Sequence, residues 1–69
     1  MTHRLGIFAT AAGWVLADED RLETYETRDG AVEAALRLAH IARWRGADVE
    51  VLAQQHPGGP LALVEAPAV

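Results

Sequence analysis

Residues 27–46, TRDGAVEAALRLAHIARWRG, carry the strongest structural signal in this chain. Thr27 and Asp29 are both residue types that cap a helix N-terminus, and Asp29 places negative charge at the positive end of the helix dipole. Gly46, which follows two arginines in the last turn, is typical of a helix C-terminus. These signals predict one long helix from about Arg28 to Arg45.

The predicted helix has one face rich in small apolar residues and an opposite face that carries two large ones. At about 100° per residue, the first face should pack closely on a sheet and holds Val32, Ala35, Leu36, Leu38, Ala39 and Ala42. The opposite face holds Glu33, Arg37, Ile41 and Trp44. Ile41 and Trp44 are three residues apart, so they are surface neighbours that interrupt an otherwise polar face.

Short stretches on both sides of the helix carry strand signals: two have a period of two residues, and the other three contain strand-forming residues next to turns. They are Arg4 to Ala9, Trp14 to Ala17, Leu22 to Glu26, Val49 to Gln54 and Leu61 to Val64. Turn-forming residues separate them, above all HPGGP at 56–60. The sequence therefore predicts an α+β fold in which an antiparallel sheet of four to five strands packs on one long helix, in the order βββαββ. We expect a single domain over residues 1–69, with a frayed tail from about residue 66.

The size and composition of the chain predict a modest core. Its 69 residues lie near the lower limit for a domain that folds alone. Of the residues in the 51% hydrophobic fraction, 14 are alanines, which bury little apolar area. With no cysteine and no cluster of metal-ligating residues, oligomerisation or very regular packing must stabilise the fold. We therefore expect a homodimer.

The charge and the apolar pattern argue against two classes of partner. A net charge of −4 repels phosphate backbones, so nucleic-acid binding would need a local basic patch. Phe8, Trp14 and Tyr25 lie on predicted strands among acidic or apolar neighbours, which favours core packing over base stacking. No apolar run approaches the roughly 20 residues of a membrane span, and the N-terminus lacks the apolar region of a signal peptide. We expect a cytoplasmic protein without a membrane partner.

Residue types that perform catalysis or bind cofactors are few and scattered. His3, His40 and His56 lie far apart, without the spacing of a metal site. The chain has no serine and no cysteine, and no motif places a base beside a threonine. Gly58 and Gly59 lie between prolines and do not open a helix, so they predict no phosphate site. We predict no catalytic, cofactor-binding or metal-binding residues, and no enzymatic activity.

Two interpretations account for Ile41 and Trp44. In the first, Trp44 folds over the helix end and covers the rim of the sheet, and Ile41 is one of the scattered apolar residues that every surface carries. In the second, the two residues form an interface, because Trp and Arg are enriched among binding hot spots. We hypothesise that Arg37, Ile41, Trp44 and Arg45 contact a protein partner or a second copy of the chain.

Several segments resemble domain-of-unknown-function family 2188, a family of small bacterial proteins. They are GWV at 13–15, ETRD at 26–29, AVEAA at 31–35, Ala39 and GADVEV at 46–51. The likeness covers about Arg4 to Glu65 and implies strands, an alanine-rich helix capped by Thr27 and a final strand pair, with no attached activity. A weaker likeness, over Leu5 to about Val51, is to the HicB-type antitoxin fold, and it implies a toxin partner.

Taken together, these features predict a small protein-protein interaction or self-association module without enzymatic activity. The alternative is a regulator that binds nucleic acid or a HicB-like toxin partner.

Overall fold

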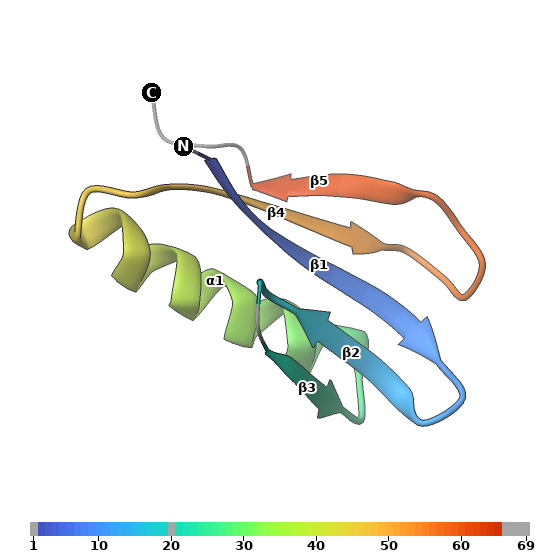
Figure 1. The fold of residues 1–69 in the computed structure, drawn as a ribbon. Coiled ribbons are helices and arrows are strands. Elements are labelled where there is room, and N and C mark those ends of the chain that lie inside the picture. Colours follow the sequence, from blue (N-terminus) through green and yellow to red (C-terminus); the bar gives the residue numbers. More distant parts are fainter. Residues whose placement is uncertain (1, 20, 66–69) are drawn as a thin grey trace.

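The computed structural model describes residues 2–19 and 21–65. One helix lies along one face of a five-stranded sheet (Figure 1), so the α+β class and the single long helix are confirmed. The chain runs through three strands, the helix and two further strands. The expected frayed tail from about residue 66 lies outside the described residues.

The elements follow the alternation and cap signals of the sequence closely. The strands are β1 (Thr2–Thr10), β2 (Gly13–Ala17), β3 (Leu22–Tyr25), β4 (Asp48–Gln54) and β5 (Leu61–Glu65), and the helix is α1 (Arg28–Trp44). Of the two candidate N-caps, Thr27 is the cap, and its hydroxyl accepts a hydrogen bond from the Gly30 amide at 3.0 Å. At the other end Arg45 is the C-cap, and Gly46 adopts a left-handed φ of +89°. Local chemistry therefore fixes both ends of α1.

The sheet is mixed, and the prediction of a purely antiparallel sheet is wrong. Its strand order is β3-β2-β1-β4-β5, and β1 pairs in parallel with β4 while all other pairs are antiparallel. The helix is the reason. β3 runs in the same direction as β1, and α1 then carries the chain back along the sheet, so β4 starts at the same end as β1 (Figure 1).

The core lies between α1 and the sheet. Ala31, Ala35 and Ala39 are fully buried on the helix, and their small side chains allow the helix axis to approach the strands closely. The strands contribute Leu5, Ile7, Leu16, Val49, Val51 and Ala53. The prediction that Leu38 belongs to the buried face of the helix is wrong, because Leu38 is 37% exposed. The buried stripe is narrower than predicted and is centred on the alanines.

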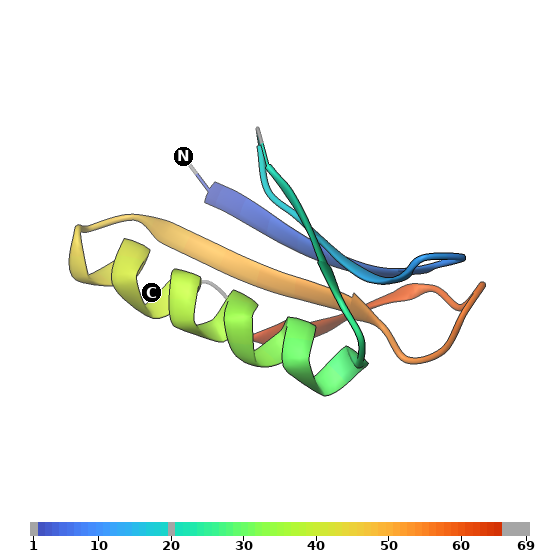
Figure 2. The same ribbon diagram turned by 90° about the horizontal axis from the view of Figure 1, so that it is seen from below.

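The opposite face of the sheet has no helix or strand over it within the described residues (Figure 2). Phe8 lies on this uncovered face, where its ring covers Gly6: a Cβ at Gly6 would come within 2.8 Å of it. Core packing was expected for Phe8, Trp14 and Tyr25. Trp14 and Tyr25 do pack against the core, but Phe8 does not, because strand alternation directs it away from Ile7 and the helix.

No helix in residues 2–19 and 21–65 is both long enough and apolar enough to span a bilayer.

Candidate functional site

A groove separates the C-terminal half of α1 from the turn between β2 and β3. Its volume is about 360 Å³. The twist of the sheet carries this turn away from the helix, as the edge-on view in Figure 2 shows, and leaves one flank of α1 uncovered. The apolar lining consists of Leu5, Leu38, Ile41, Ala42, Ala47 and Val49, and the rim of His3, Asp18, Glu19, Arg21 and Arg45.

Two of the four predicted interface residues, Ile41 and Arg45, line this groove. Ile41 is 47% exposed and, with Arg45, lines the groove wall. Leu38, Ile41 and Arg45 follow one another at three- and four-residue spacing, so they form one line along the helix. The sequence analysis put Ile41 on the face opposite the sheet. It lies instead on the flank of α1, where it lines the groove together with Leu38.

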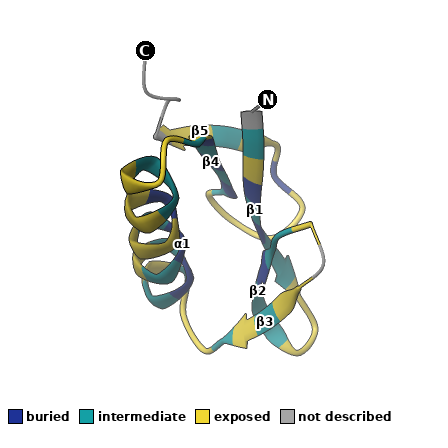
Figure 3. Ribbon diagram, turned by 60° about the vertical axis from the view of Figure 1, so that its left-hand side comes forward, coloured by how far each residue is buried: buried dark blue, intermediate teal, exposed yellow. Residues whose placement is uncertain are grey.

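Trp44 is 89% exposed, and the interpretation in which it folds over the rim of the sheet is therefore wrong. Arg37, also exposed, is near enough to β3 for its positive charge to act on the Tyr25 hydroxyl. We call Arg37, Ile41, Trp44 and Arg45 the helix flank. They are neighbours on the helix surface, and all four are exposed. Figure 3 shows the exposed parts of α1 in yellow.

Short polar contacts hold the opposite wall of the groove. His3 Nδ1 on β1 lies 3.0 Å from Glu19 Oε1. Within the turn, the Glu19 amide donates to Asp18 Oδ1 at 2.7 Å, and the Asp18 amide donates to the Arg21 carbonyl at 2.9 Å. The wall opposite the helix flank therefore presents two carboxylates together with a histidine and an arginine.

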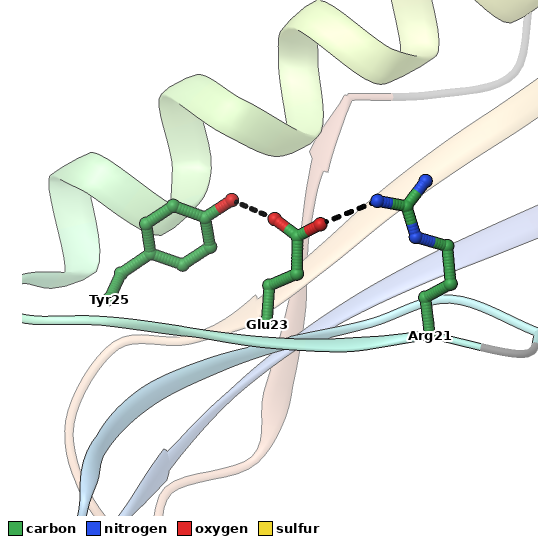
Figure 4. A network of polar contacts seen from close by, with 3 residues as sticks. All are labelled: Arg21, Glu23 and Tyr25. Carbon is green, nitrogen blue, oxygen red and sulfur yellow. Dashed lines mark hydrogen bonds and ion pairs between the residues drawn. The ribbon is translucent and has the colours of Figure 1, made fainter.

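A second network fixes Arg21 at the groove (Figure 4). The Arg21 guanidinium donates to Glu23 Oε1 at 2.8 Å, and the Tyr25 hydroxyl donates to Glu23 Oε2 at 2.7 Å. The hydrogen bond from Tyr25, followed by the Arg21 charge, lowers the pKa of Glu23 below its ordinary value. The same hydrogen bond raises the pKa of Tyr25, because it stabilises the protonated phenol. The network therefore connects the Arg21 side chain, which lines the groove, to two side chains of β3.

The groove combines an apolar surface with ionisable side chains at its rim. Its lining contains neither a hydroxyl nor a thiol, and its ionisable groups are the Asp18 and Glu19 carboxylates, His3, Arg21 and Arg45. Among the described residues, no three histidine or acidic side chains gather as a metal site. His3, His40 and His56 come from β1, α1 and the turn before β5. The chemistry available is apolar contact with charge of both signs around it.

The uncovered face of the sheet carries a second hollow, of about 570 Å³, that the sequence analysis missed. Phe8, Leu52 and Leu61 line it, together with Arg4, Gly6 and the turn after β2. The signal was the apolar character of Leu52, Leu61 and Leu63 at outward positions of their strands. Their adjacency to Phe8 depends on the parallel pairing of β1 with β4, which the sequence pattern does not encode.

Comparison with family models, with curated proteins and with solved structures found no match for this chain. The resemblances to family 2188 and to the HicB-type fold remain predictions from the residues.

Proposed function

We propose that this chain is a cytoplasmic, non-enzymatic protein-protein interaction module whose helix flank and groove bind an apolar segment of a partner protein. One observation carries the proposal: Trp44, 89% exposed, lies three residues along α1 from Ile41, which lines a groove with an apolar floor and a charged rim. A large exposed aromatic side chain beside an unfilled apolar groove is typical of a binding surface.

The apolar area that a partner could bury at Trp44 and Ile41 is large enough for a hot spot. A tryptophan buries about 150–250 Å² when it is covered. At about 25 cal/mol per Å², this corresponds to about 4–6 kcal/mol before the entropic cost of association. Ile41 adds to this area at the groove wall. A partner residue that covered both side chains would gain more than the roughly 2 kcal/mol that defines a hot spot.

The rim charges favour a protein partner over a phosphate backbone. Asp18 and Glu19 stand across the groove from Arg45, so the rim presents both signs of charge. Nucleic-acid surfaces need a basic patch, which two neighbouring carboxylates oppose. A segment with an apolar side chain between charged or polar residues fits this pattern, and the rim charges would orient it more than they would add affinity.

Panning a random peptide library displayed on phage against the immobilised protein tests the proposal. The matched variant is Ile41→Gln with Trp44→Gln, which removes the apolar flank and keeps good helix formers. We expect the wild type to enrich peptides with large apolar residues, and a selected peptide to bind the double variant at least about 30-fold more weakly. Leu22→Thr, at an exposed residue outside the groove, is the control that should retain binding.

Failure to enrich any peptide, or equal binding to the double variant, would refute the proposed surface. The alternative of a nucleic-acid-binding regulator makes a different prediction. Fluorescence anisotropy with labelled duplex and single-stranded DNA at low salt should show no binding if the proposal is correct. Binding that weakens steeply as salt is raised would favour the alternative.

A further inference from the structure

We infer that the uncovered face of the sheet is a dimerisation surface, on which a second copy of this chain packs its own sheet face to face. We call this surface the open sheet face: the side of the sheet away from α1, with Phe8, Val15, Leu52, Leu61 and Leu63. It lies on the opposite side of the sheet from α1, so this inference does not depend on the proposed partner groove.

Strand register makes the open sheet face one continuous apolar patch. Phe8 on β1 lies opposite Val15 on β2, and Leu52 on β4 lies opposite Leu63 on β5. Gly6 on β1 is the register partner of Leu52, and the Phe8 ring covers it. Apolar side chains from four adjacent strands therefore lie close together on this face. The polar residue Gln54, the register partner of Leu61, lies beside them, and its side chain hydrogen-bonds with the Ala9 amide and the Gly59 carbonyl.

This pattern is the reverse of a solvated sheet face. An antiparallel sheet that faces water on one side carries polar residues on that side. Here Leu61 and Leu63 are 42% and 56% exposed, at positions where polar residues are expected. Domains bury each apolar face against another layer, and within the described residues this face has none. A second sheet of the same kind would supply that layer.

The distribution of charge determines which surface a second copy can approach. Two chains of net charge −4 repel each other, so they can approach most closely through surface that carries little charge. On the described part of the open sheet face, the charged strand residues Arg4, Asp48 and Glu50 lie at the end where β1 and β4 begin, and Arg4 pairs with Glu50. Asp18 and Glu19, in the turn after β2, border the hollow at the same end. The centre of the face is uncharged. Two copies can therefore place these centres together.

The area of the face predicts a weak, reversible dimer. Five strands about 4.8 Å apart and about five residues long cover roughly 24 by 17 Å, or about 400 Å² on each protomer. The two footprints together give about 800 Å², below the roughly 1,600 Å² of a standard stable interface and within the range of transient ones. The dimer should therefore form as the protein concentration rises and dissociate on dilution.

Sedimentation equilibrium from about 5 µM to about 1 mM tests the inference with the whole chain. The first variant is Leu61→Thr with Leu63→Thr, which makes two exposed positions polar and keeps good strand formers. The second is Val15→Thr on β2, remote from the β5 edge. Ile41→Gln with Trp44→Gln is the matched control on the other side of the molecule. Circular dichroism verifies that each variant is folded.

We expect the wild type and the Ile41/Trp44 control to dimerise with the same dissociation constant, and both sheet-face variants to dissociate at least about tenfold more readily. A wild type that stays monomeric throughout the range overturns the inference. Unchanged dimerisation of the Leu61/Leu63 variant also overturns the inference. Loss of the dimer in the control alone would move self-association to the helix flank. Loss in the Leu61/Leu63 variant but not in Val15→Thr would indicate edge pairing through β5, and would also overturn it.

Discussion

Replacement of Gly13 by alanine should destabilise the fold far more than the same replacement at Gly46. Both residues have positive φ, +122° at Gly13 and +89° at Gly46. Their surroundings differ. A Cβ at Gly13 would lie 2.8 Å from the Tyr25 carbonyl oxygen, whereas a Cβ at Gly46 would meet nothing within 4 Å. Gly46→Ala therefore measures the backbone cost alone, and Gly13→Ala measures this cost together with a clash against β3.

The magnitudes follow from these two terms. A non-glycine residue in the left-handed region costs about 1–2 kcal/mol, which is the whole effect expected at Gly46. At Gly13 the clash is with backbone rather than with a flexible side chain, so β3 must shift, and crowding of this kind adds about 1–3 kcal/mol. The total of about 2–5 kcal/mol is a large share of the roughly 3–10 kcal/mol expected for a chain of this length.

Urea unfolding of the wild type and both variants, followed by far-UV circular dichroism, measures the difference. The slope against urea should be unchanged in Gly46→Ala, and the midpoint shift of Gly13→Ala should be at least about twice as large. In Gly13→Ala we expect β3 amides to lose protection from hydrogen exchange first, because β3 pairs only with β2. Equal midpoint shifts in the two variants would refute the argument from the Tyr25 carbonyl.

Two further predictions concern α1 and β3. Thr27→Ala removes the acceptor of the Gly30 amide and should lower the free energy of unfolding by about 1 kcal/mol, measured by thermal or urea unfolding. Thr27→Ser should retain most of the stability of the wild type. An alanine variant as stable as the wild type would contradict the role of Thr27 as the cap. Because the pKa of Glu23 is lowered in the folded protein, the contribution of Glu23 to folding stability is present above the ordinary pKa of 4.5 and is lost as the pH falls. Because the pKa of Tyr25 is raised, the contribution of Tyr25 to folding stability is lost as the pH rises beyond 10.0. The wild type should therefore lose stability more steeply than Tyr25→Phe at both extremes, and identical pH profiles would show that the hydrogen bond between them is not formed in solution.

The sequence predicted best those features that depend on neighbouring residues. The start of α1 follows from the Thr27 hydroxyl and its end from Gly46, and both lie within one turn of the boundary they mark. β1 and β4 followed from alternation over six residues each, and the shorter strands from their residue types and the turns beside them. Even the short β3, from Leu22 to Tyr25, has the predicted place and pairs with β2 along its length.

Features that depend on distant residues were less predictable. Alternation is the same in parallel and antiparallel strands, so nothing in β1 or β4 alone indicated their direction. The position of Ile41 depends on the rotation of α1 about its axis, which the fit of Ala35 and Ala39 against the strands determines. The open sheet face could not be found before the strand order was known, because Phe8 and Leu52 become neighbours only through the pairing of β1 with β4.

That pairing also limits when the chain can fold during its synthesis. β1, β2 and β3 are joined by short turns, as are β4 and β5, but Leu5 meets Val51 only across 46 positions of sequence. Closing a loop of that length costs about 1.4 kcal/mol more than closing one of ten residues. β1 therefore leaves the ribosome well before its parallel partner, and the core cannot close until β4 has emerged.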